Sequence, residues 1–96
     1  MNEIKFKAFL ESDINESTGK DKLTSDGINS RISKGKKAED ILGMDLDEIV
    51  SSDTEMRKAL EKLQEHENPS HNQMQNAVRK YYKFRNNKEC PRKKDL

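Results

Sequence analysis

The sequence predicts an all-α protein, a compact bundle of four main helices and one short helix. Apolar residues recur at helical spacing, whereas β-branched residues are too scattered to form a strand of alternating pattern. Polar stretches with helix-capping residues separate these apolar stripes. Of the 96 residues 30% are apolar and 39% charged, so the core must be thin. A chain of this length closes one core, and we expect a single domain.

The first helix is expected to begin after Asn2, a good N-cap, and to end at about residue 14. Its apolar arc consists of Phe6, Phe9, Leu10 and Ile14. Residues 15–22 contain a glycine and no apolar residue, which predicts a polar loop.

A second helix follows this loop. Thr24 is its predicted N-cap, because Leu23 before the cap and Ile28 after it have the spacing of a hydrophobic staple. Gly43 is the predicted C′ residue that ends the helix. Gly35 lies inside it, where glycine costs roughly 0.5–1 kcal/mol relative to alanine.

Two further helix starts follow in close succession. Asp45 with Glu48 has the spacing of a capping box and predicts a short helix, and Ser52 with Glu55 predicts the next one. The apolar stripe of that next helix is Met56, Ala59, Leu60 and Leu63. It should end before Pro69, because the residue preceding a proline avoids helical geometry.

The last helix, residues 70–84, should be the one on which the others pack. Ser70 is its expected start. One broad face is apolar and is formed by Met74, Ala77, Val78, Tyr81, Tyr82 and Phe84. The tail at residues 87–96 has no periodicity, so we expect a helical domain at residues 1–86 and a disordered basic tail after it.

The charge is near balance overall but uneven along the chain. The formal net charge is +1, yet residues 20–38 hold six basic and two acidic residues, and residues 68–96 hold eight and two. Residues 39–67 between them hold three basic and ten acidic residues. Such a chain can present a basic patch despite its neutral balance.

The sequence also indicates a soluble cytoplasmic protein. No apolar run approaches the roughly 18 residues of a membrane span, and no signal-peptide core precedes the first charges. Cys90 is the single cysteine, so no internal disulfide can form, and a free thiol suits a reducing compartment.

No group of residues has the spacing of a catalytic or cofactor site. His66 and His71 lack a cysteine or acidic partner at metal-ligand spacing, and Ser51 lacks a nucleophile elbow. Asp45, Asp47 and the residues after them lack the glycine and terminal glutamate of a calcium-binding loop. We therefore expect no enzyme, no cofactor, no metal and no small-molecule substrate.

The basic helix faces are the remaining candidate site. Six cations on the second and last helices are candidate contacts to DNA phosphates: Arg31, Lys34, Lys37, Arg79, Lys80 and Lys83. Small polar residues such as Asn29 and Ser30 are interleaved with them, and groove or phosphate contact would use such side chains. The alternative is that these charges only keep the helix faces solvated.

Three stretches resemble a known family, the N-terminal core-binding (SAM-like) domain of tyrosine recombinases and phage integrases, and its orphan bacterial relatives. They are residues 23–33 (LTSDGINSRIS), 41–47 (ILGMDLD) and 76–84 (NAVRKYYKF), and the likeness extends over about residues 3–85. The resemblance implies a helical domain that forms half of a clamp around double-stranded DNA. Because the catalytic residues of that family lie in a separate domain, it implies no cleavage or ligation here.

Two residues depart from the family pattern. Arg31 stands where an aromatic residue is usual, and Gly35 where a large aliphatic one is usual. Each missing buried methylene would contribute about 0.8 kcal/mol, so this small-residue seam could admit side chains of another chain. A protein-interaction or dimerisation module, giving a homo-oligomer, is therefore the alternative to DNA binding, and a fragment of a longer recombinase or restriction-type protein is a third possibility.

Overall fold

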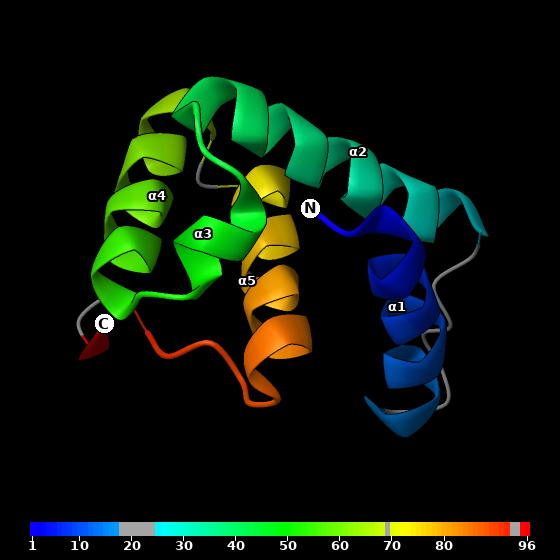
Figure 1. Ribbon diagram of the computed structural model, residues 1–96. Helices are drawn as coiled ribbons and strands as arrows, with labels where there is room; N and C mark the ends of the chain where they lie inside the picture. Colours follow the sequence, from blue (N-terminus) through cyan, green and yellow to red (C-terminus); the bar gives the residue numbers. More distant parts are fainter. Residues whose placement is uncertain (18–24, 69, 93–94) are drawn as a thin grey trace.

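A computed structural model describes residues 1–17, 25–68, 70–92 and 95–96. These residues form five helices (Figure 1). They are α1 (Glu3–Ser17), α2 (Ser25–Leu42), α3 (Leu46–Val50), α4 (Asp53–His66) and α5 (Gln73–Asn86). The described residues contain no strand, which confirms the all-α prediction. None of these helices combines the length and the apolar character that crossing a membrane requires.

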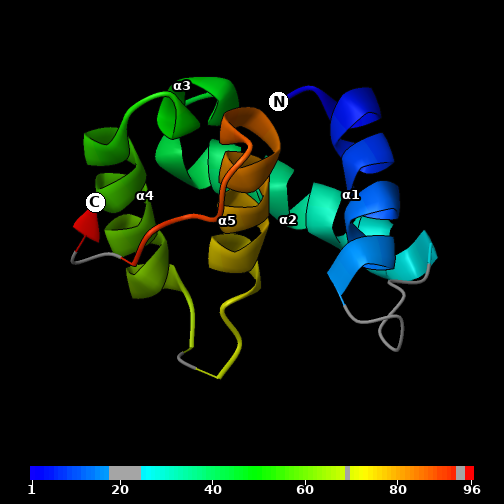
Figure 2. The same ribbon diagram turned by 90° about the horizontal axis from the view of Figure 1, so that it is seen from below.

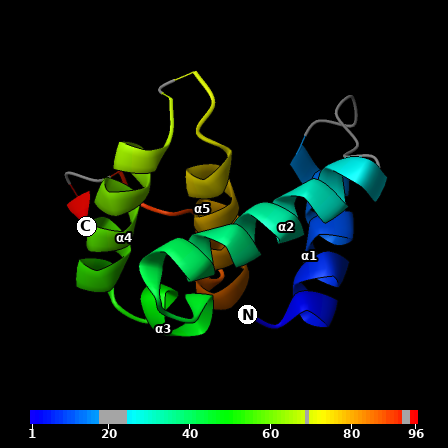
Figure 3. The ribbon, with the colours of Figure 1, turned by 90° about the horizontal axis from the view of Figure 1, so that it is seen from above.

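Helix α2 lies across one end of the other helices. Figure 1 shows α4, α5 and α1 side by side beneath it, with α4 and α5 antiparallel. The view from above in Figure 3 shows α2 crossing both α1 and α5. The amino terminus lies in the middle of this arrangement, between α1, α3 and α5.

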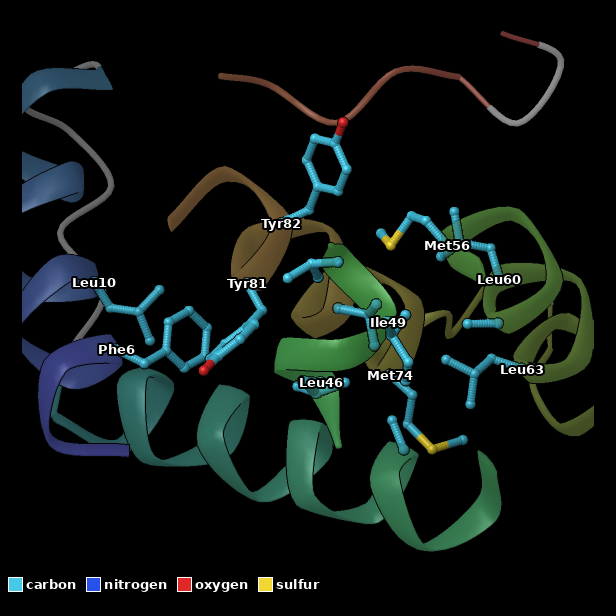
Figure 4. Packing of buried hydrophobic residues seen from close by; sticks show 14 of the residues in the cluster. Phe6, Leu10, Leu46, Ile49, Met56, Leu60, Leu63, Met74, Tyr81 and Tyr82 are labelled. Atoms are coloured by element: carbon cyan, nitrogen blue, oxygen red, sulfur yellow. The ribbon is translucent and has the colours of Figure 1, made fainter. Parts of the chain in front are cut away.

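Helix α5 is the centre of the core, as its apolar face predicted. Met74, Ala77, Val78, Tyr81 and Tyr82 are all buried. Side chains from α3 and α4 pack on one side of α5, and side chains from α1 on the other (Figure 4). The core therefore has two parts that share α5.

Four aromatic rings join α1 to α5. The Phe6 ring lies 4.9 Å from the Tyr81 ring and 5.7 Å from the Phe84 ring, measured between centroids. The Phe9 ring lies 5.4 Å from the Phe84 ring. Tilted and edge-on pairs at these distances contribute about 0.5–1.5 kcal/mol each beyond the burial of their area.

Three of the predicted helix caps are confirmed. Asn2 Oδ1 accepts a hydrogen bond from the Lys5 amide at 3.2 Å, and Asp45 Oδ1 accepts one from the Asp47 amide at 2.8 Å. Ser52 Oγ accepts one from the Glu55 amide at 3.4 Å. The expected N-cap of the second helix, Thr24, and Leu23 of its expected staple lie outside the described residues.

The start of α5 differs from the prediction. The helix begins at Gln73, and Ser70 Oγ lies 3.0 Å from His71 Nδ1 instead of capping it. Glu67 Oε1 accepts a hydrogen bond from the Gln75 amide at 3.0 Å, so a carboxylate from the end of α4 satisfies the first turn. Glu67 lies 8 residues before Gln75, farther than the two or three residues that separate a capping side chain from its amide.

The segment after α5 contacts the body of the protein. Figure 2 shows it turning back along α5 and passing toward α4. Cys90 and Leu96 are partly buried against the core, and Lys83 Nζ lies 2.9 Å from Glu89 Oε1. This packing differs from the disordered tail expected from the low periodicity of residues 87–96.

The gap expected at Gly35 is filled from within the chain. A Cβ atom added at Gly35 would lie 3.3 Å from Met1 Sδ and 3.4 Å from Leu46 Cδ1. The volume of the missing aliphatic side chain is therefore taken by the amino-terminal residue and by α3. The argument that this seam receives another chain does not hold at Gly35.

Candidate nucleic-acid interface

Arg31, Lys34 and Lys37 form one row on α2. They are spaced three residues apart, so they follow one side of the helix. Ile28 and Ala38 on the neighbouring side are buried, which fixes the orientation of α2 on the bundle. Arg31 and Lys34 are half-buried at the edge of the core, whereas Lys37 is exposed.

A hollow of about 210 Å³ lies where α2 crosses the start of α5. Its described lining residues are Gly27, Ser30, Arg31, Lys34, Gln73 and Asn76. Two cations thus meet a hydroxyl and two side-chain amides, and none of these described residues carries a carboxylate. Such a set of donors is suited to an anionic oxygen.

A second hollow of about 250 Å³ adjoins the first, with Lys34 and Gln73 in both. Lys37 also borders this second hollow, together with His66 at the end of α4 and with Glu67 and His71 from the connection between α4 and α5. One carboxylate, that of Glu67, therefore lines the second hollow. All three α2 cations therefore face the same region of the surface.

The α5 cations are placed on two sides of that helix. Lys80 comes four residues after Asn76, so it lies one turn beyond the first hollow on the same side of α5. Lys83 bonds Glu89 of the tail, and Arg79 lies near enough to Cys90 for its charge to act on the thiol. Burial raises the pKa of Cys90, and the Arg79 charge offsets part of that rise.

The structure thus brings together Arg31, Lys34 and Lys37, with Lys80 at the edge of the group, and directs Arg79 and Lys83 toward the tail. Gln73 and Asn76 are site residues that sequence reasoning missed. They carry no charge and lie at the start of α5. Only the crossing of α2 over α5 brings them to the cations.

The described residues contain no group of three or more His, Cys, Asp or Glu placed to hold a metal ion. The first hollow, by contrast, places Arg31 and Lys34 beside neutral hydrogen-bond donors. Comparison of the chain with protein-family models, with curated proteins and with solved structures found no match.

Proposed function

We propose that this protein is a small, non-catalytic DNA-binding domain that contacts the phosphates of duplex DNA. Arg31, Lys34 and Lys37 on α2 are the central contacts, and Arg79, Lys80 and Lys83 on α5 are the outer ones. It acts in the cytoplasm, needs no cofactor, and has the fold of the tyrosine-recombinase core-binding domain that its sequence resembles.

The hollow between α2 and α5 is the observation that carries this proposal. Arg31 and Lys34 supply charge, and Ser30, Gln73 and Asn76 supply neutral donors beside it. Gly27 in the same wall has no side chain to hold a phosphate away. Phosphate contacts in DNA complexes combine charged and neutral donors in this way.

Binding to a mixed-sequence duplex, measured by fluorescence anisotropy at two salt concentrations, tests the proposal. Two variants carry the same loss of charge: Lys34→Gln with Lys37→Gln on α2, and Lys58→Gln with Lys62→Gln on the exposed side of α4. If both α2 lysines touch phosphates, the first variant should lower the slope of log K against log salt by about 2. The second variant should leave the slope unchanged.

Three results would contradict the proposal: no binding at low salt, binding that ignores salt, or equal losses in the two variants. Circular dichroism of each variant checks that the helices remain.

Self-association is the alternative function, and it was suggested by the small-residue seam. Since Met1 and Leu46 occupy the space at Gly35, that seam no longer supports it. Sedimentation equilibrium tests it directly, because a dimerisation module must sediment as a dimer at high concentration.

A further inference from the structure

Both histidines of the chain lie at one place, the second hollow beside α2. The sequence holds two histidines, and His66 at the end of α4 and His71 before α5 both line this hollow of about 250 Å³. Lys34 and Lys37 of α2 line it as well. Histidine is the side chain whose charge ordinarily changes between about pH 5 and pH 8. The charge of the second hollow therefore depends on pH, whereas no histidine is among the described residues that line the first hollow.

The connection between α4 and α5 holds His71 in place. The His71 amide donates to the Asn68 carbonyl oxygen at 3.0 Å, and Ser70 Oγ lies 3.0 Å from His71 Nδ1. When an imidazole is protonated, both of its nitrogens are hydrogen-bond donors. Nδ1 of a protonated His71 can then donate to Ser70 while Nε2 donates to an anion.

Glu67 is the one carboxylate among the described residues that line the second hollow, and its position is compatible with an anion there. Its Oε1 atom accepts a hydrogen bond from the Gln75 amide at 3.0 Å, and its Oε2 atom is buried without a partner. One oxygen is thus bonded to α5 and the other is covered by the protein. The negative charge of Glu67 also favours the protonated form of a nearby imidazole.

The other charged groups around the imidazoles come from α2 and α4. Lys34 and Lys37 line the hollow, and Asp40 follows Lys37 by one turn of α2. Lys62 precedes His66 by one turn of α4, and the residues of α5 that line the hollow carry no charge. The lysines oppose protonation of the imidazoles, because like charges disfavour the charged form. A bound phosphate offsets the lysines, so phosphate binding and imidazole protonation favour each other.

We propose that the second hollow is a further phosphate site, in which His66 and His71 bind as imidazolium ions beside Lys34 and Lys37, so that DNA binding takes up protons. This inference rests on the proposed DNA binding. Lys34 and Gln73 line both hollows, so the two sites are adjacent and one DNA strand can occupy both. A fall in pH adds positive charge at the second site, and the protein therefore binds DNA more tightly in acid than at neutral pH.

Duplex binding at constant ionic strength, measured by fluorescence anisotropy at about pH 7.5 and at about pH 5.5, tests the proposal. The unaltered chain should bind about tenfold more tightly at the lower pH, since positive charge is gained beside a phosphate. The double variant His66→Gln with His71→Gln keeps polar side chains but cannot gain this charge. It should bind like the unaltered chain at the higher pH and show almost no dependence on pH.

A matched control separates the hollow from a general effect of net charge. Thr54→His, made in the double variant, returns one histidine at an exposed position in the first turn of α4, whereas His66 lies at the other end of that helix. This histidine titrates away from the hollow, so it should not restore the dependence on pH.

Nuclear magnetic resonance reads the site directly in the unaltered chain, and so does not depend on how the variants fold. The chain has two imidazoles, both at this hollow, so their C2 proton signals report on it alone. The two signals are titrated with pH in the presence and absence of a short duplex. The duplex should move both titration midpoints to higher pH, because a phosphate stabilises the imidazolium form.

The outcomes separate this inference from the function on which it rests. Equal affinity at both pH values, midpoints that the duplex leaves unmoved, or a dependence on pH that survives in the double variant would overturn the inference and leave DNA binding in place. Recovery of that dependence with Thr54→His would overturn it as well. Absence of binding at both pH values would overturn the inference and the proposed function together.

Discussion

At the scale of residues, polar atoms at helix junctions determine how α1 is attached. Tyr81 was expected from its spacing to be a core residue, and its ring is indeed buried. Periodicity says nothing about its hydroxyl, which connects Asn2 with Asp47. Burial raises the pKa of Tyr81 well above its usual value, and the hydrogen bond to Asp47 adds to the rise. Tyr81 therefore remains a neutral donor to Asp47.

The first prediction concerns this hydroxyl. Tyr81→Phe should lower the free energy of unfolding by about 1–3 kcal/mol, since it leaves the Asn2 amide without this partner and removes one of the hydrogen bonds to Asp47. Tyr82→Phe is the matched control and should cost about 1 kcal/mol, because Tyr82 makes one bond, to Asp53 at 2.8 Å. Urea unfolding measures both, and equal losses would contradict the role given to Tyr81.

The second prediction concerns pH, and it follows from the groups around Met1. Burial alone would lower the pKa of the α-amino group, but its bonds to Asp45 and Glu39 outweigh burial and raise the pKa above 8.0. The ammonium in turn lowers the pKa of Asp45 below 3.8. Glu39 and Asp47 also face the amine. Asp47 in addition accepts a hydrogen bond from the Tyr81 hydroxyl and forms an ion pair with Arg85.

A raised amine pKa means that its stabilisation is complete below pH 8 and is lost as the pH rises through the folded-state value. A lowered carboxyl pKa means that the contribution of Asp45 is complete above about pH 4 and is lost as the pH falls through its folded-state value. Urea unfolding between about pH 6 and about pH 9.5 should therefore show a loss of stability on the alkaline side. The loss should be smaller for Asp45→Asn, and an identical loss would contradict this account.

At the scale of elements, local chemistry predicted where several helices begin and where α2 ends, whereas α1 extends to Ser17 beyond its predicted end at about residue 14. Asn2, Asp45 and Ser52 cap helices as expected because each needs only an amide two or three residues away. The start of α5 was predicted at Ser70 but lies at Gln73, and the amide of Gln75 in the first turn is bonded by Glu67, the residue just after α4. Gly43 was predicted as the C′ residue of α2, and its φ of 67° confirms the left-handed geometry that favours glycine there.

The third prediction tests this helix end. Gly43→Ala should destabilise the protein by about 1 kcal/mol, because a Cβ atom is strained at positive φ although no atom lies within 4 Å of it. Gly43→Asn should cost less, since asparagine adopts this geometry more readily. Thermal unfolding of the two variants separates backbone strain from crowding, and a stabilised alanine variant would contradict the explanation.

At the scale of the whole molecule, sequence periodicity identified the buried face of α5 but not which polar side chains of other helices lie beside it. The apolar stripes of α3, α4 and α5 predicted the part of the core that these helices share. The approach of Gln73 and Asn76 to the α2 cations depends on how α2 crosses α5, which no local pattern encodes. The filling of Gly35 by Met1 is likewise a contact between residues far apart in sequence.

The last prediction concerns the segment after α5. Its lack of apolar periodicity predicted a disordered tail. Tyr82 lies beside it, and burial together with a hydrogen bond to Asp53 raises the pKa of Tyr82 to about 12, with a smaller contribution from Cys90. Truncation after Lys88 keeps the left-handed Asn87 that ends α5 but removes Cys90 and Leu96 from the core surface. The free energy of unfolding should fall by about 1–2 kcal/mol, because two partly buried apolar groups are lost.

Alkaline titration of tyrosine absorbance should show one tyrosine ionising at lower pH than in the full chain, since water then reaches Tyr82. A truncated chain with an unchanged unfolding midpoint and an unchanged titration would show that the tail does not pack on the bundle in solution.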